Sequence, residues 1–232
     1  MKALILCAGE GRRLRPITQI LPKPLVSVAG EPMVVRQIKA LKKAGITSMV
    51  INTAHGARLL EAHLGDGSDF GVQLRYSNEG NSAEEALETL GGIVKALPLL
   101  TDEDEESFLV VAGDIVTDYD YTSFILAEKE LLSHQRAAHL VLVPNPPYHL
   151  KGDMSLEYGI VSRVSTSLTF SSLGLYRADI FKDLPEERSK LFPWLWGCVD
   201  ADLVSGELYE GLWLNVGDFE ELAKANEALR ND

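Results

Sequence analysis

Cysteine and long apolar runs are both scarce in this chain of 232 residues. Its two cysteines, Cys7 and Cys198, lie far apart and lack the spacing of a metal site, which fits a reducing compartment. No apolar run approaches the ~18 residues of a membrane-spanning helix, so no membrane partner is expected. The apolar run near the N-terminus ends in glycines instead of a cleavage site, so no signal peptide is expected. Together these absences favour a cytoplasmic protein.

Basic residues are in deficit overall, because 22 Lys and Arg oppose 34 Asp and Glu and the net charge is -12. This balance argues against nucleic acid as a partner, since a polyphosphate backbone needs a basic face. Residues 1–43 are the exception, because Lys and Arg far outnumber Asp and Glu there. A locally cationic site in an acidic protein suits a small anionic ligand.

Two familiar phosphate-binding motifs are missing as well. The dinucleotide fingerprint G-x-G-x-x-G fails because its third glycine would fall at Leu14. The P-loop fails because no Gly-Lys-Ser/Thr follows Gly9. The histidines have no metal-ligand spacing, and no catalytic triad stands out. The chemistry must therefore rest on a different set of residues.

What the chain does contain is an apolar run, residues 3–8, that leads directly into Gly9, Gly11 and a group of cations. Glycines let backbone N–H groups approach a ligand closely and form an anion-binding concavity. Arg13 and Lys23 can add charge-assisted hydrogen bonds to phosphate oxygens. The pattern G-x-G-x-R-L-x-P followed by P-K-P indicates a strand that opens into a polyphosphate-binding loop. The alternative is a basic surface turn.

Strand-like and helix-like segments alternate along much of the chain. The expected strands are residues 3–8, 48–53, 72–76, 108–112 and 168–176. The expected helices are residues 32–44, 56–64, 90–97 with a stop at Pro98, 189–203 and 219–229. This alternation predicts an α/β fold with a doubly wound, mostly parallel sheet. Residues 144–164 break the rhythm and predict loops and short antiparallel strands that cap the site.

Ligands bind such sheets at the carboxyl ends of the strands, where the glycine loop and Asp114 both fall. The chain has no internal repeat, flexible linker or low-complexity tract, so residues 1–232 are expected to form a single domain.

The glycine loop resembles the signature of the sugar-1-phosphate nucleotidylyltransferases, which make nucleoside-diphosphate sugars. Further matching segments follow in the expected order: Val50-Ile51-Asn52-Thr53-Ala54, Leu87-Glu88-Thr89, Gly113-Asp114, Leu168-Thr169-Phe170-Ser171 and Val204-Ser205-Gly206-Glu207. Together they are most similar to one branch, the bacterial N-acetylmuramate-1-phosphate uridylyltransferases of cell-wall recycling. The Glu-Lys-Pro element of many thymidylyl and glucose enzymes is missing, which fits this branch.

The resemblance implies a Rossmann-like nucleotidyltransferase fold with a small antiparallel sugar-binding cap. It divides the domain into a nucleotide-binding half, residues 1–120, and a sugar-binding half, residues 121–232. The implied reaction transfers a uridylyl group from UTP to N-acetylmuramic acid 1-phosphate and releases pyrophosphate, within peptidoglycan recycling. The implied partners are UTP and a sugar 1-phosphate, and the implied cofactor is Mg²⁺.

The resemblance also assigns catalytic and metal-binding roles. Arg13 matches the catalytic arginine of the family, and Lys23 matches the lysine of its P-K-P element. Asp114 matches the metal-binding aspartate. Its predicted partner, Asn215, stands where an aspartate is usual and offers an oxygen ligand without a charge. The alternatives are a turn at Asp114 and a turn or helix cap at Asn215.

Binding residues follow from the same resemblance. The predicted nucleotide-binding residues are Ala8, Gly9, Gly11, Glu79, Glu85 and Gly92, with either Glu79 or Glu85 facing the ring N–H of uracil. The predicted sugar-binding residues are Gly152, Asp153, Phe170, Ser171 and Ser172. Leu90 departs from the branch, where a glycine is usual. The carboxylate of N-acetylmuramic acid needs a cation or several N–H donors, and the candidate cations are Lys151 and Arg163.

Two other functions stay open. The first is nucleotidylyl transfer to another hexose 1-phosphate (glucose, N-acetylglucosamine or mannose) from UTP, dTTP or GTP. The second is a nucleotide- or sugar-binding regulatory domain without catalysis, which the departures at Leu90, Asn215 and Asp218 motivate. Release of pyrophosphate would separate the enzymes from the binding domain.

Overall fold

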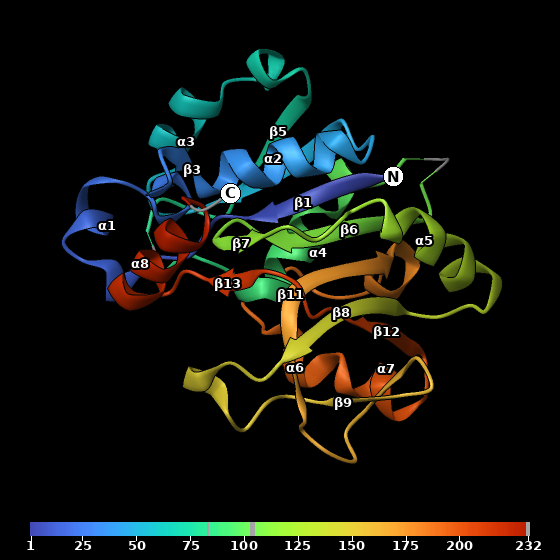
Figure 1. Ribbon diagram of the computed structural model, residues 1–232. Coiled ribbons are helices and arrows are strands. Elements are labelled where there is room, and N and C mark those ends of the chain that lie inside the picture. Colours follow the sequence, from blue (N-terminus) through green and yellow to red (C-terminus); the bar gives the residue numbers. More distant parts are fainter. Residues whose placement is uncertain (83, 103–104, 231–232) are drawn as a thin grey trace.

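A nine-stranded sheet organises the chain, and two small two-stranded ribbons accompany it (Figure 1). The structure is a computed structural model, which describes residues 1–82, 84–102 and 105–230. The strands of the large sheet, in chain order, are β1 (Lys2–Leu6), β4 (Ser48–Thr53), β5 (Gln73–Asn78), β6 (Ser107–Ala112), β8 (Ala138–Pro144), β9 (Ser155–Glu157), β10 (Ile160–Ser162), β11 (Leu168–Arg177) and β12 (Val204–Leu208). The ribbons pair β2 (Ser27–Val28) with β3 (Glu31–Pro32), and β7 (Ile115–Thr117) with β13 (Trp213–Asn215).

Most strands of the large sheet point in one direction. Strands β5, β4, β1 and β6 are parallel neighbours in that order. Strand β11 runs antiparallel to both β6 and β8, so β8 and its parallel neighbour β12 point the same way as β6. Beyond β12, strands β10 and β9 form an antiparallel hairpin at the sheet edge. The predicted doubly wound, mostly parallel sheet is confirmed, and this antiparallel hairpin extends the same sheet.

Helices cover both faces of the sheet. They are α1 (Ile17–Ile20), α2 (Met33–Lys43), α3 (Ala57–Leu64), α4 (Glu88–Leu100), α5 (Ser123–Ser133), α6 (Leu191–Trp194), α7 (Trp196–Asp200) and α8 (Phe219–Ala228). Helices α2, α3 and α5 supply side chains to the apolar cluster on one face, and α4, α6 and α7 supply the cluster on the other. Within the described part of the chain, no helix is long and apolar enough to cross a membrane.

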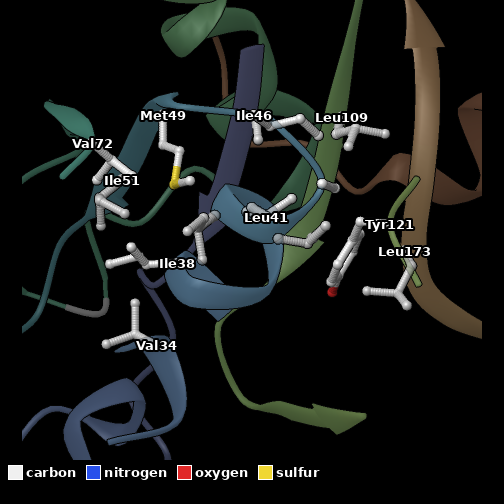
Figure 2. Packing of buried hydrophobic residues seen from close by; sticks show 14 of the residues in the cluster. Val34, Ile38, Leu41, Ile46, Met49, Ile51, Val72, Leu109, Tyr121 and Leu173 are labelled. Carbon is white, nitrogen blue, oxygen red and sulfur yellow. The ribbon is translucent and has the colours of Figure 1, made fainter. Parts of the chain in front are cut away.

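The central strands are apolar throughout because both faces are covered. Successive side chains of a strand point to opposite faces, so Leu4 joins one cluster while Ile5 joins the other. Such continuous apolar runs are typical of parallel sheets between two layers of helices. Figure 2 shows Ile38 and Leu41 of α2 in one of these clusters, together with Met49 of β4. The core therefore fixes the carboxyl ends of β1, β4 and β6 at one edge of the sheet.

The predicted helix stop at Pro98 is wrong. Helix α4 continues to Leu100 and holds Pro98 inside its last turns. A proline lacks a backbone donor, so it removes one helical hydrogen bond. Leu100 is fully buried, and the N–H of Thr101 still bonds to the carbonyl of Leu97 at 3.0 Å. Packing against the sheet therefore outweighs the local preference of the proline.

The predicted single helix over residues 189–203 is wrong as well. Two short helices, α6 and α7, stand there instead. Phe192 has φ -99° and ψ 135°, which is extended backbone. The following Pro193 excludes the α region for the residue before it, so the chain bends at this point.

Candidate active site

A pocket of about 460 Å³ opens at the carboxyl ends of β1 and β6. Its lining includes Ala8 and Gly9 from the loop after β1, Asn52 from β4 and Asp114 after β6. We name it the β1 pocket. Open parallel sheets bind ligands at this edge, so the predicted polyphosphate loop and the predicted metal aspartate share one cavity.

The two glycines of the loop have different surroundings. Gly9 lines the β1 pocket, and a Cβ built there would meet nothing within 4 Å. Gly11 has a left-handed φ of 67°, and a Cβ there would lie 3.0 Å from the Cβ of Lys23. The hydroxyl of Thr18 donates to the Gly11 carbonyl at 2.8 Å and holds this turn. Gly9 therefore leaves room for a ligand, whereas Gly11 lets the Lys23 stem pass close to the backbone.

Lys23 and Asp114 form an ion pair at the pocket edge. Lys23 is 9% exposed, and its Nζ donates to Oδ2 of Asp114. The backbone carbonyl of Asp114 accepts a hydrogen bond from Val216 N–H at 3.1 Å. In the ribbon beside it, Asn215 of β13 lies opposite Ile115 of β7. The ribbon thus brings the backbones of residues 114 and 215 to neighbouring positions from distant parts of the sequence.

As the predicted metal ligands, these two residues would form a sparse oxygen donor set. Among the described residues, no group of three or more His, Cys, Asp or Glu could hold a metal ion. Mg²⁺ is commonly bound through one or two carboxylates, with waters and substrate phosphates as its other ligands. Asp114, with Asn215 as a second oxygen donor, fits that pattern, provided that Lys23 shares or releases the carboxylate when the cation and phosphates arrive.

Arg13 lies near the same C-terminal segment. Its side chain is 71% exposed, and Nη1 is 3.7 Å from Oδ2 of Asp218. A Cβ at Gly217 would lie 2.5 Å from Nη2 of Arg13, so the glycine permits this approach. Asp218 also caps helix α8 by accepting from the N–H of Glu221 at 3.0 Å. The guanidinium is therefore accessible to a ligand and is attached only weakly to the protein.

The deep wall of the β1 pocket holds a chain of hydrogen bonds that the sequence analysis missed. The N–H of Cys7 donates to Asn52 Oδ1 at 2.6 Å, and Asn52 Nδ2 donates to Glu79 Oε1 at 2.7 Å. The other carboxylate oxygen of Glu79 accepts from Leu87 N–H at 2.7 Å. A Cβ at Gly92 would lie 2.5 Å from Glu79 Oε1, so Gly92 makes room for this carboxylate. Burial raises the pKa of Glu79 above its ordinary value.

The structure separates the two acids considered for base recognition. Glu79 is 7% exposed and lines the β1 pocket. Glu85 is exposed, and its Oε2 accepts from the N–H groups of Asn81 and Ser82 at 2.6 and 3.1 Å. Glu85 therefore shapes its own loop. The signal for Asn52 was available in the sequence, because it is a polar residue at the carboxyl end of an apolar strand.

We predict that Asn52→Asp destabilises the fold in a pH-dependent way. The new carboxylate would face Glu79 at hydrogen-bond distance, and two such groups can share one proton but repel once both ionise. A carboxyl with a raised pKa favours the fold at low pH and loses that contribution as the pH rises through the shifted pKa. We expect a loss of about 3 kcal/mol in the free energy of unfolding at pH 8, as for an uncompensated buried charge, and a smaller loss at pH 5.

Urea unfolding at the two pH values measures this effect. The matched control is the double variant Asn52→Asp with Glu79→Gln, which exchanges acid and amide while keeping a donor and an acceptor for every bond. It should recover most of the lost stability. An Asn52→Asp variant as stable as the parent at pH 8 would show that the two side chains are not in contact.

A second pocket of about 290 Å³ adjoins the first, and both are lined by Leu6, Glu88 and Thr89. We name it the β11 pocket. Phe170 and Ser172 of β11 line it, and Ser172 has a left-handed φ of 64° next to an irregularity in the strand pairing.

The other predicted sugar-binding residues make hydrogen bonds within the protein or form a turn. The Ser171 hydroxyl is fully buried and donates to the Val141 carbonyl at 2.6 Å. Asp153 accepts from Phe170 N–H at 2.9 Å and lies 2.9 Å from His149 Nε2. Gly152 has a left-handed φ of 61° in the turn before Asp153. These residues hold the β11 segment in place, and of the five predicted sugar-binding residues, Phe170 and Ser172 line the β11 pocket.

A segment of the second half, residues 187–189, packs against the first turn of α4. Leu90 and Gly91 donate their N–H groups to the Ser189 carbonyl at 3.0 and 3.3 Å. A Cβ built on Gly91 would collide with the backbone carbonyl of Glu187, so Gly91 is the residue that lets the two segments approach closely. Leu90 is buried in the core. This segment brings Arg188 to the β1 pocket. No feature of the sequence pointed to Arg188.

The two cations considered for a sugar carboxylate lie elsewhere. Arg163 Nη1 pairs with Asp200 Oδ2 at 3.0 Å, and its guanidinium stacks 4.8 Å above the ring of Trp196. Lys151 is exposed in the turn after residues 147–149. Neither residue lines the β1 pocket or the β11 pocket.

The chain was compared with known proteins. The nucleotidyl transferase family matches residues 2–167. An N-acetylmuramate alpha-1-phosphate uridylyltransferase from Neisseria meningitidis serogroup B is 44% identical over 230 residues, which cover 97% of this chain and 96% of that protein. A UTP–glucose-1-phosphate uridylyltransferase from Synechocystis sp. is 35% identical over 135 residues, which cover 56% of this chain and 34% of that protein.

Solved structures share the fold. A proposed glucose-1-phosphate thymidylyltransferase from Bacillus anthracis, crystallised with sucrose, superposes with a TM-score of 0.84 at 21% identity, covering 100% of this chain and 96% of that chain. At 21% identity, this structural similarity supports only a shared fold. The family match over most of the chain and the full-length similarity of the Neisseria protein carry the assignment further. The chain belongs to the nucleotidyl transferase family.

Proposed function

We propose that this protein transfers a uridylyl group from UTP to N-acetylmuramic acid 1-phosphate, giving UDP-N-acetylmuramic acid and pyrophosphate. The observation that carries the proposal is the 44% identity to an N-acetylmuramate alpha-1-phosphate uridylyltransferase over 97% of this chain. The cationic glycine loop beside Asp114 supports the same chemistry. Such a reaction serves peptidoglycan recycling in the cytoplasm.

The bond changes need little covalent help from the protein. A phosphate oxygen of the sugar phosphate attacks the α-phosphorus of UTP, and the bond from that phosphorus to the bridging oxygen breaks. Pyrophosphate leaves with the electron pair. A phosphate monoester has a second pKa near 6, so it is already a nucleophile at neutral pH. The barrier comes from repulsion between anions, which positioned positive charge lowers.

We assign each site residue a part of this chemistry from its position. We assign Arg13, with its exposed guanidinium, to the triphosphate oxygens, since a planar fork matches two oxygens at once. We assign Lys23, a compact charge beside Asp114, to the α-phosphate or the sugar phosphate. Asp114 and Asn215 would hold Mg²⁺, which when bound neutralises phosphate charge. Ala8, Gly9 and the buried Glu79 would contact the nucleoside, because they line the β1 pocket.

The sugar would occupy the adjoining β11 pocket, against Phe170 and Ser172. We treat residues 1–232 as one domain, because the nine-stranded sheet takes strands from both halves of the chain. The first half then supplies the nucleotide contacts, and the second half supplies most of the sugar contacts.

A panel assay tests the proposal. Purified protein is incubated with UTP, Mg²⁺ and one sugar phosphate at a time, and pyrophosphate release is measured. We expect release with N-acetylmuramic acid 1-phosphate to exceed release with the 1-phosphates of glucose, mannose and N-acetylglucosamine. Omission of Mg²⁺ with EDTA should abolish the signal, and dTTP or GTP should support less turnover than UTP.

The other outcomes separate the competing functions. Release with a different hexose 1-phosphate, but not with the muramic substrate, would keep the enzyme class and overturn the substrate. No release with any sugar phosphate, together with measurable UTP binding, would favour a regulatory binding domain. That domain is less well supported, because Arg13, Lys23 and Asp114 are all present.

A further inference from the structure

The β11 pocket has a charge imbalance that bears on which sugar it takes. Two charged residues line it, Glu88 and Lys190, both of them exposed to solvent, and the rest of its lining is mostly apolar. Glu88 is at the mouth shared with the β1 pocket. Lys190 is the residue that precedes helix α6. The two charges would cancel if they paired with each other.

They do not pair, because Glu88 has another partner. Nη2 of Arg188 lies 3.4 Å from Oε1 of Glu88, and Nη1 of Arg188 donates to the Glu84 carbonyl at 3.0 Å. Arg188 therefore balances the charge of Glu88 from the side of the β1 pocket. Lys190, among the residues that the structure describes, has no ion-pair or hydrogen-bond partner for its ammonium. The β11 pocket is left with one uncompensated positive charge.

An uncompensated cation against apolar walls suits a ligand that carries both a carboxylate and apolar groups. Phe170 and Phe192, with ring centroids 5.8 Å apart, supply the apolar surface next to Lys190. N-acetylmuramic acid differs from N-acetylglucosamine by a lactyl ether, which adds a methyl group and a carboxylate. Leaving that carboxylate without a partner in a pocket would be costly, and a lysine at the wall removes this cost.

The arrangement also explains why other cations are poor candidates. Arg163 is committed to Asp200 and Trp196, and Lys151 is outside both pockets. Arg188 is committed to Glu88. Lys190 is the lining cation of the β11 pocket whose charge is not already matched within the described chain.

We infer that Lys190 binds the lactyl carboxylate of N-acetylmuramic acid 1-phosphate and sets the preference for this sugar over N-acetylglucosamine 1-phosphate. This inference rests on the proposed function. It assigns substrate selection to the segment before α6 and not to the segment around residues 151–163.

The test compares kcat/KM for the two sugar phosphates, with UTP saturating, in the parent and in Lys190→Met. Methionine keeps the length and apolar stem of lysine and removes the charge. We expect kcat/KM for the muramic substrate to fall by about tenfold or more, as for loss of a charge-assisted hydrogen bond. For the glucosamine substrate we expect a change of less than about threefold. Lys190→Arg should retain the preference, because it keeps the charge.

Lys182→Met is the matched control, since Lys182 is an exposed lysine outside both pockets. It should leave both values unchanged. If Lys190→Met lowers kcat/KM equally for both substrates, or for neither of them, the inference is overturned. If the parent itself does not use the muramic substrate, the proposed function fails instead, so the two failures are told apart by the parent alone.

Discussion

Replacing Arg13 by alanine is expected to lower kcat by about 100-fold or more, the usual effect of removing a preorganised charge donor. The guanidinium is 71% exposed at the edge of the site, and among the described residues its ion-pair partner is Asp218 at 3.7 Å. An exposed pair of this kind adds little to stability. The variant should therefore fold as the parent does and fail in catalysis, because it loses the forked charge that we assign to the triphosphate.

The measurement is the steady-state rate of pyrophosphate release at saturating substrates, with the thermal midpoint recorded for each protein. Arg15→Ala is the matched control. Arg15 lies two residues away and pairs with Glu10, whereas Arg13 pairs with Asp218 of the C-terminal segment. It should keep kcat within about threefold of the parent, as expected for an exposed pair. An Arg13→Ala variant with parental kinetics would remove Arg13 from the mechanism.

The order of strands and helices could be predicted because both faces of the sheet are covered. That arrangement makes each central strand a continuous apolar run, such as residues 3–8, and each covering helix a periodic one, such as residues 32–44. The sequence analysis predicted no element for helix α5 or for strands β8 and β12 of the large sheet. Two further errors occurred where a proline had to be weighed against packing. Pro98 was expected to end a helix that packing continues, and the effect of Pro193 on the residue before it was not considered.

The site was predictable to the extent that it is local in sequence. Gly9, Gly11, Arg13 and Lys23 stand within one short segment, and their spacing alone indicates a phosphate loop. The partnership of Asn52 with Glu79, and the approach of Arg188 and Lys190, join segments that are far apart in the chain. Only the three-dimensional arrangement decides whether a charged residue reaches a pocket, so Arg188 and Lys190 could not be singled out from the sequence.

Asp114→Asn is expected to have the largest effect of all. Asp114 is the one formal negative charge in the proposed pair of metal donors, and its side chain is 26% exposed beside the buried Lys23. Loss of a bound cation removes several kcal/mol of charge stabilisation, so kcat should fall by about 1,000-fold. The substitution also leaves the Lys23 ammonium without its ion pair, so the thermal midpoint should fall as well. Added Mg²⁺ should recover little of the rate.

Asn215→Asp distinguishes a metal-binding role of Asn215 from a structural one. It adds a carboxylate to the proposed pair of metal donors, whereas Asp114→Asn removes one. It adds a negative charge where the amide oxygen now stands, on the strand β13 that lies opposite β7. If Asn215 contributes an oxygen to the cation, the variant should reach half-maximal rate at a lower Mg²⁺ concentration than the parent, by about threefold to tenfold, since ligand charge raises affinity. In the double variant with Asp114→Asn, the new carboxylate should restore part of the lost rate. Titration of Mg²⁺ in the parent, in each single variant and in the double variant checks this. A higher Mg²⁺ requirement in Asn215→Asp, with no rescue in the double variant, would mean that Asn215 serves only as the turn before helix α8.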